Sequence, residues 1–158
     1  MPDESSPSFH LAQYNVARMV YPLDAPEMTG FRELLDPIHK AGDESPGFVW
    51  RFKGAEGDYA LDVRPSDGDA GVLVSMTVWE TPEALQAFMR GAHFEAFRRR
   101  REWFAKGSGE NVCWWVPVGH QPTLQEGEAA LARLRHCGES SLTAFTLRDI
   151  IKARTTNE

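Results

Sequence analysis

The pattern of hydrophobic and polar positions along the chain predicts an alternation of strands and helices. Alternation and short apolar runs predict strands at 9–18, 48–52, 72–79 and 112–118. Helical spacing predicts helices at 24–42 and 82–91, and Thr81 before Pro82 is typical of a helix start. The resulting order, strand-helix-strand-strand-helix-strand, is that of the split βαβ motif. The sequence therefore predicts an α+β, ferredoxin-like fold with an antiparallel sheet and helices on one face.

Further elements surround this motif in a single domain that spans residues 8–148. A helical insert is predicted at 93–106, a last helix at 123–138, a short strand at 143–147, and a loop at 54–71 that contains a short strand at 59–63. Residues 1–7 and 149–158 are expected to be terminal tails.

The strand registers separate a polar set of side chains from an apolar set. The polar phase contains Gln13, Asn15, Arg51, Ser75, Thr77 and Trp79. The opposite phase contains Phe48, Trp50, Val74, Met76 and Val78, which suit a core covered by helices. The other face would be left uncovered, so we expect a homodimer, a dimeric α/β barrel, to cover it. The polar set then lines a chamber for a polar, ring-containing small molecule, unless that face is solvated or is a plain dimer interface.

Composition narrows the range of functions. The formal net charge of −6 argues against nucleic-acid binding, and no apolar run approaches the length of a membrane span. The N-terminus lacks the basic and apolar regions of a signal peptide, so we expect a cytoplasmic protein. Cys113 and Cys137 share no ligand spacing and are interpreted as reduced thiols. No metal-binding motif or dinucleotide fingerprint is present, so no metal and no cofactor are expected.

Histidines and arginines are the remaining candidates for chemistry. His93 opens a predicted helix and suits a general base or a ligand contact, or else a structural role. His120 ends a strand, where a pocket mouth or an ordinary loop would lie. The run Arg98–Arg101 fans around a helix, so it is either a solvated face with ion pairs or it turns one arginine inward to hold an anion.

Several motifs together resemble a known bacterial family. They are HLAQYNVAR, PGFVWRF, VSMTVWETPEALQAF, RRREWF, WWVPVGHQPT and AFTL. From about residue 9 to 147, they are similar to the family called domain of unknown function 3291. That family is grouped with dimeric α/β barrels beside the antibiotic-biosynthesis monooxygenases, and it has no common activity.

This resemblance implies roles for a few positions. In the wider superfamily an asparagine on the first strand and a tryptophan line the chamber, and Asn15 and Trp79 stand at comparable places. Haem-degrading relatives bind the iron through a histidine. The corresponding position in this chain lies near Arg98 and holds no histidine, which argues against haem bound there. Asparagine is common in the family where this chain has Ser75.

These observations lead to one functional hypothesis and two alternatives. We expect a small-molecule enzyme of secondary or aromatic metabolism, a cofactor-independent monooxygenase acting on an aromatic or polyketide-like substrate. Asn15 and Trp79 would orient the substrate, and Arg51 or Arg98 would stabilise its anion, with His93 as base. The alternatives are a cyclase, isomerase or lyase that does not use oxygen, and a non-catalytic ligand- or haem-binding module.

Overall fold

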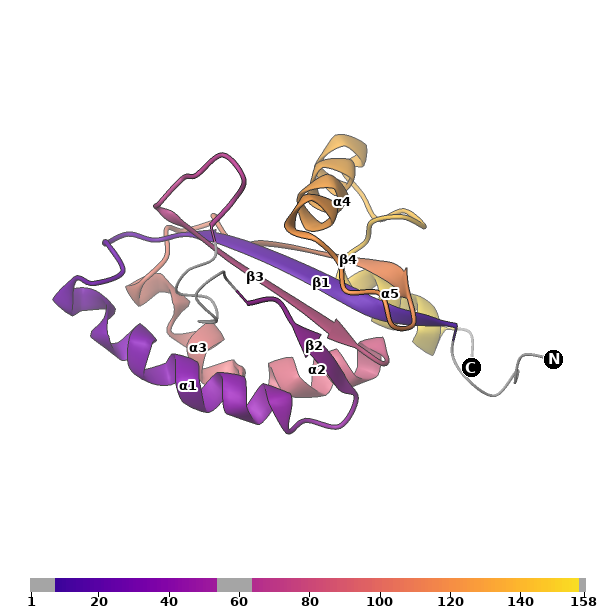
Figure 1. The fold of residues 1–158 in the computed structure, drawn as a ribbon, viewed down its shortest axis with the longest axis horizontal. Coiled ribbons are helices and arrows are strands. Elements are labelled where there is room, and N and C mark those ends of the chain that lie inside the picture. The colour runs from indigo at the N-terminus through magenta and orange to yellow at the C-terminus, as the bar shows by residue number, and fades with distance from the viewer. Residues whose placement is uncertain (1–7, 54–63, 157–158) are drawn as a thin grey trace.

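The computed structural model of the protein describes residues 8–53 and 64–156. Its strands, α-helices and 3-10 helices (η) are β1 (Phe9–Arg18), η1 (Pro26–Met28), α1 (Thr29–Asp43), β2 (Phe48–Arg51), β3 (Val72–Trp79), α2 (Pro82–Arg90), α3 (Phe94–Arg98), η2 (Arg100–Glu102), β4 (Glu110–Pro117), α4 (Leu124–Cys137) and α5 (Leu147–Thr155). The strands form one antiparallel sheet in the order β2-β3-β1-β4 (Figure 1). This arrangement confirms the predicted α+β, ferredoxin-like fold.

Local signals in the sequence set the main element boundaries. β1 and β3 begin and end at the predicted residues. Thr81 caps α2 by accepting a hydrogen bond from the Ala84 backbone at 3.1 Å, and Thr123 caps α4 by accepting one from the Glu126 backbone at 3.2 Å. These two side chains satisfy amides that lack a partner within their helices.

The predicted assignment of the two sheet faces was wrong. Figure 1 shows α1, α2 and α3 on one side of the sheet and α4 on the other. The face that carries Leu11 and Trp79 packs on Ile38 of α1 and on Leu85 and Phe88 of α2. Gln13 and Thr77 share this face because they lie two residues along the same strands. The polar set therefore faces the three helices, and the chamber that it lines lies under these helices instead of on an uncovered face.

A bulge in β2, which the sequence pattern does not reveal, places Phe48 on the other face from the one predicted. Phe48 lies opposite Trp79, whereas Trp50 lies opposite the next residue, Val78. The extra residue, Val49, turns Phe48 to the face of Trp79 and Arg51. Phe48 accordingly packs edge-on against Trp79, with ring centroids 5.4 Å apart, instead of joining the apolar face.

The apolar face of the sheet is covered by α4. Ala130 and Leu131 pack on Tyr14, Val74 and Met76. α4 can approach closely because a Cβ at Gly127 would come within 2.5 Å of the Tyr14 ring, so only glycine fits there. Burial, with a smaller contribution from the carboxylate of Glu128, raises the pKa of Tyr14 to about 12.

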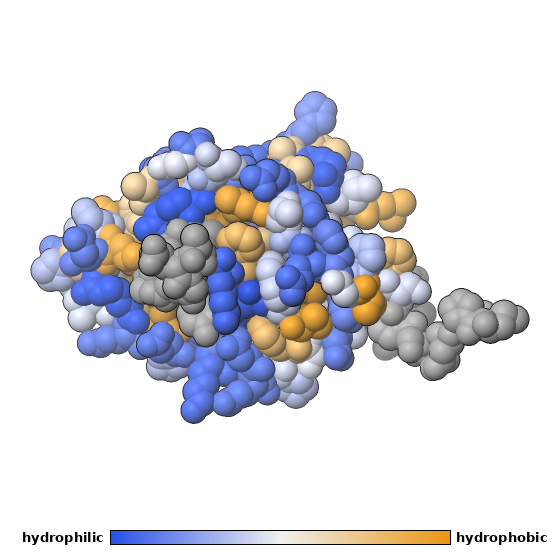
Figure 2. All heavy atoms as spheres, in the orientation of Figure 1, coloured by the Kyte–Doolittle hydropathy of each residue, from blue (hydrophilic) through white to orange (hydrophobic). Residues whose placement is uncertain are grey.

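This burial removes the argument from which we expected a dimer. Ala12, Val78 and Val116 on that face are at most 2% exposed in a single chain. On the side drawn in Figure 2, apolar surface appears in separate groups among hydrophilic side chains. The homodimer itself stays a prediction, which light scattering at micromolar concentration can test.

Two further segments differ from expectation. The helical insert is not one helix, because it divides into α3 and η2, and α3 has no buried residue to hold a longer helix in place. At the C-terminus, residues 149–155 form most of α5 instead of a tail, and Ile150 packs against the core beside α2. The predicted strand at 143–147 is reduced to one bridge between Phe145 and Cys113. The predicted strand at 59–63 and the tail at 1–7 lie outside the described residues.

Candidate functional site

A cavity of about 270 Å³ lies between the polar face of the sheet and helices α1, α2 and α3. Its floor is made by side chains of β1, β2 and β3, with Asn111 of β4 at one margin. Its roof is made by apolar side chains of the helical layer: Phe31, Leu34, Leu35, Ile38, Phe88, Met89, Ala96, Phe97, Trp103 and Phe104. The site therefore combines a polar floor with an apolar roof, which is the usual composition of a small-molecule pocket.

Strand register places the polar floor in two rows across the sheet. In the first row, Arg51 pairs with Thr77 and Thr77 pairs with Gln13. In the second row, Ser75 pairs with Asn15 and Asn15 pairs with Asn111. Directly paired residues of neighbouring strands point to the same face, so each row presents its side chains together.

The two rows differ in their access to solvent. Gln13 and Thr77 are only 3% and 7% exposed, whereas Asn111 is exposed and Asn15 is half-buried. The first row is thus the closed end of the cavity, and the second row lies toward its mouth. In the second row, the Asn15 amide donates a hydrogen bond to Ser75 Oγ at 3.3 Å.

Gln13 is the clearest sign of a ligand at the closed end. Its amide nitrogen is buried and has no hydrogen-bond partner among the described residues. A buried N–H group without a partner costs free energy, on the order of 1–3 kcal/mol. A ligand oxygen placed in the cavity would supply the missing acceptor.

Arg51 brings a positive charge to the same end. Its side chain is 8% exposed, contacts Asp43 at 3.4 Å, and lies over the Phe48 ring at 5.5 Å. The guanidinium reaches the cavity past Gly42 of α1, where a Cβ would come within 2.7 Å of its Nη2 atom. The absence of a side chain at Gly42 therefore makes room for Arg51.

His93 stands in the loop before α3 and supplies a basic nitrogen. Burial, and next the charge of Arg51, lower the pKa of His93 below its ordinary value of 6.5, so the ring is neutral at neutral pH. Its Nδ1 atom is buried and has no hydrogen-bond partner among the described residues. In the tautomer with its proton on Nε2, this atom can accept a proton from a ligand.

Trp79 lies on the same sheet face as Thr77, beyond the closed end of the cavity, and does not line the cavity. It is fully buried, and its Nε1–H group donates a hydrogen bond to Thr77 Oγ1 at 2.9 Å. Its ring stacks on Phe88 with centroids 5.3 Å apart, and Phe88 contacts the His93 ring at 5.7 Å. Trp79 thus positions Thr77 and Phe88, which line the cavity, and does not line it itself.

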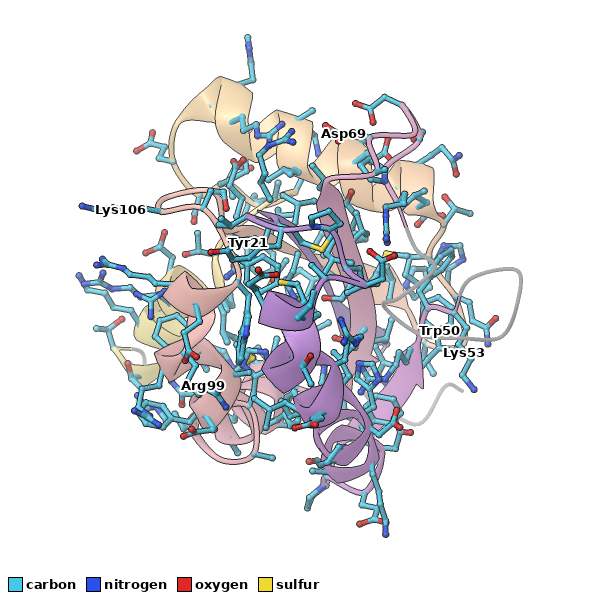
Figure 3. The ribbon with its side chains drawn as sticks, turned by 90° about the vertical axis from the view of Figure 1, so that its left-hand side faces the viewer. Tyr21, Trp50, Lys53, Asp69, Arg99 and Lys106 are labelled. Carbon is cyan, nitrogen blue, oxygen red and sulfur yellow. The ribbon has the colours of Figure 1, made fainter. Side chains whose placement is uncertain are left out.

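Two other predicted site residues lie away from the cavity. Arg98 is exposed and pairs with Glu95 at 2.7 Å, as in the solvated alternative, whereas Arg100 of the same run lines the cavity. His120 is exposed and contacts the carboxylate of Glu126 at 2.9 Å. In Figure 3 the neighbouring Arg99 lies on the helical segment on one side of α1, while Trp50 of β2 lies on the other. Arg99 pairs with Glu102 and stacks on Trp103 at 4.8 Å, so it closes the outside of the roof.

Sequence reasoning missed several residues of the site. His39 of α1 lines the cavity and is 7% exposed, and Asn111 stands at the mouth. His39 falls on the apolar stripe of α1, one residue after Ile38, which could have indicated that it points inward. The roof aromatics gave no separate signal, because rings that line a cavity and rings that fill a core have the same spacing.

In the described part of the chain, neither nucleophilic chemistry at Cys113 nor metal binding has structural support. Burial raises the pKa of the Cys113 thiol to about 12, which makes it a poor nucleophile. Within residues 8–53 and 64–156, no group of three or more His, Cys, Asp or Glu side chains could hold a metal ion. None of the helices in these two ranges is long and apolar enough to cross a membrane.

Comparison with solved structures finds the same fold at low sequence identity. NE2512, a protein of unknown function from Nitrosomonas europaea, is 10% identical with a TM-score of 0.51, covering 73% of this chain and 97% of its own. SnoaB, a cofactor-independent oxygenase from Streptomyces nogalater, is 15% identical with a TM-score of 0.49, covering 72% and 98%. The ActVA-Orf6 monooxygenase from Streptomyces coelicolor, solved with nanaomycin D, is 15% identical with a TM-score of 0.44, covering 75% and 97%.

Sequence comparison identifies a family for this chain, but no individual curated protein similar to it. A search of curated proteins finds no match to the chain. The model of the family described as "Domain of unknown function (DUF3291)" matches residues 10–158, which includes the described sheet from the second residue of β1 onward and the helices around the cavity. The chain belongs to this DUF3291 family.

Proposed function

We propose that the protein is an enzyme that binds a small, weakly acidic aromatic molecule in this cavity and oxygenates it without a cofactor. One observation carries the proposal: a buried, unpartnered Gln13 amide and a neutral His93 lie at the cavity end that also holds the Arg51 guanidinium. An apolar roof favours an aromatic ring, and this polar end favours an acidic hydroxyl.

The residues at the closed end have separate roles in forming a reactive anion of the substrate. His93 Nδ1 accepts the proton of a phenolic or enolic hydroxyl. Arg51 stabilises the resulting negative charge, and the Gln13 amide donates a hydrogen bond to the same oxygen. The anion spreads its charge to the carbon para to the oxygen, which makes that carbon electron-rich enough to reduce O2.

The oxygenation that follows needs only the substrate and O2. With 1-naphthol, one oxygen atom forms a new bond to the para carbon, and the ring loses its hydroxyl hydrogen and its para hydrogen. The other oxygen atom leaves with these two hydrogens as water, so that 1-naphthol and one O2 give 1,4-naphthoquinone and one water. The ring supplies all four electrons that O2 takes up.

Oxygen uptake tests the proposal. Purified protein treated with a chelator is expected to consume one O2 for each 1,4-naphthoquinone formed. His93→Gln is expected to lose about 100-fold or more in kcat, the usual contribution of a general base. His120→Gln is the matched control, because this exposed histidine lies outside the cavity, and it should keep full activity.

Other outcomes discriminate between the proposed reaction and its alternatives. Exchange of the para hydrogen of 1-naphthol with deuterated water, without O2 uptake, would show proton transfer alone and favour an isomerase or cyclase. Absence of both exchange and oxygen uptake above the protein-free rate, with 1-naphthol and its one-ring and two-ring analogues, would contradict the enzyme. Tight binding without turnover would then indicate a ligand-binding module.

A further inference from the structure

We infer that the cavity selects a ligand of one or two fused rings that carries two oxygen substituents at opposite ends, one of them acidic. This inference rests on the proposed function, which requires that one oxygen of the ligand be acidic. The size of the ligand and the place of its second oxygen come from the cavity volume and from the spacing of the two polar rows.

The cavity volume limits the size of the ring system. An apolar protein cavity of about 150 Å³ is large enough to bind benzene. The cavity here measures about 270 Å³, a little less than twice as much. One or two fused rings therefore fill this volume, and we expect three linearly fused rings to exceed it.

The spacing of the polar rows limits where the ligand carries oxygen. Gln13 and Asn15 are two residues apart on β1, and both line the cavity. Side chains at this spacing on one strand face are separated by roughly 7 Å. A ligand whose acidic oxygen contacts Gln13 and His93 at the closed end can therefore place a second oxygen beside Asn15 and Ser75 only at its far end.

The two ends also differ in the charge that they favour. Arg51 and the unpartnered Gln13 amide favour an anionic oxygen at the closed end. Asn15 and Ser75 are neutral and already share a hydrogen bond of 3.3 Å, so they suit a neutral hydroxyl or carbonyl. The half-buried second row lies toward the mouth, which leaves the ligand to enter with its acidic end first.

Isomeric naphthalene diols separate this geometry from simple hydrophobic binding. In 1,5-dihydroxynaphthalene the two hydroxyls lie on opposite edges of the rings, and in 1,8-dihydroxynaphthalene they lie side by side. Calorimetric titration without oxygen is expected to show the 1,5-diol binding about 5- to 10-fold more tightly than 1-naphthol, as one hydrogen bond contributes. The 1,8-diol should bind no more tightly than 1-naphthol. Anthrone has three fused rings and should bind at least tenfold more weakly than 1-naphthol.

Variants assign the preference to the second row. Asn15→Ala should bring the ratio of the affinities for the 1,5-diol and for 1-naphthol to about one, because the second oxygen loses its neutral contact. Gln13→Leu should weaken both ligands alike. A preference that survives in Asn15→Ala, an equal loss of both ligands in that variant, or tight binding of anthrone would overturn the inference.

These titrations are independent of turnover. If the 1,5-diol is preferred through Asn15 but no ligand consumes oxygen, the inference stands and the proposed oxygenation fails. If 1-naphthol consumes oxygen but the diol is not preferred, the proposed function stands and this inference fails.

Discussion

Gly42→Ala tests whether the space at Gly42 places Arg51 in the site. A Cβ at this position would come within 2.7 Å of Arg51 Nη2 and 3.3 Å of the Phe88 ring. The Arg51 side chain is only 8% exposed, so it has little room to move aside. Such overpacking costs about 1–3 kcal/mol, while the better helix propensity of alanine contributes at most about 1 kcal/mol. We therefore expect a net loss of up to about 2 kcal/mol in the free energy of unfolding.

Gly30→Ala is the matched control in the same helix. A Cβ there would come within 2.9 Å of Arg99 Nη2, but this arginine is 31% exposed and can swing away. Gly30→Ala should therefore show only the effect of the better helix propensity of alanine, a gain on the order of 0.5–1 kcal/mol in the free energy of unfolding. Both glycines lie near an end of α1, so the difference between the variants isolates the contact with Arg51.

Urea unfolding with unchanged m-values measures this difference, and calorimetry measures 1-naphthol binding. Gly42→Ala should be less stable than Gly30→Ala by about 1–3 kcal/mol and should bind 1-naphthol more weakly, because the guanidinium is displaced. Equal stability of the two variants, with unchanged binding, would refute this role of Gly42.

Three further predictions follow from other parts of the site. The acid limb of the pH profile of kcat/KM should have an apparent pKa below 6.5, because burial and Arg51 lower the pKa of His93. Arg51→Met should move this limb to higher pH without reaching 6.5, because burial, the larger cause, persists; a limb that does not move would contradict the coupling. Trp79→Phe should cost about 1–3 kcal/mol in urea unfolding, because a fully buried ring shrinks and Thr77 loses its 2.9 Å donor; a change below about 0.5 kcal/mol would argue against this support of the floor. A thiol reagent should label only the exposed Cys137 in the native protein and both cysteines in urea; labelling of Cys113 without denaturant would show that its burial is not maintained.

The sequence predicts the elements well because their signals are local. Alternation defines β1 over ten residues, and Thr81 defines the start of α2 through one hydrogen bond. Both signals depend on neighbours in the chain, so no knowledge of the tertiary structure is needed to interpret them. The residues of the polar floor were also identified, because strand periodicity alone places Gln13 with Asn15 and Ser75 with Thr77.

The sequence did not predict which face the helices cover. We assigned the apolar phase to the helical layer, on the assumption that a face under helices must be apolar. The structure instead holds a cavity under α1 and α2, and the single helix α4 buries Val74 and Met76. Which helix covers which face depends on long-range packing, and periodicity within a strand does not encode it.

Two individual residues lie elsewhere than we expected, for similar reasons. Arg98 was expected to turn inward from the arginine run, but α3 ends at that residue and the side chain pairs with Glu95. Trp79 was expected to contact the substrate, yet the bulge at Val49 brings Phe48 over it, and Phe88 stacks on its ring. In both cases one irregularity of the backbone, invisible in the pattern, decided what the side chain can touch.

If the cavity under α1, α2 and α3 is the ligand site, a side chain that fills it should block binding. Ala96 of α3 lines the cavity, so Ala96→Trp should fill part of it. Ala92 is exposed in the segment before α3 and does not line this cavity, so Ala92→Trp is the matched control. In calorimetric titrations with 1-naphthol, we predict one site per chain in wild type and in Ala92→Trp, and a loss of at least tenfold in affinity in Ala96→Trp, since the side chain occupies the space of the ligand. Binding to Ala96→Trp with the affinity of wild type would contradict the account.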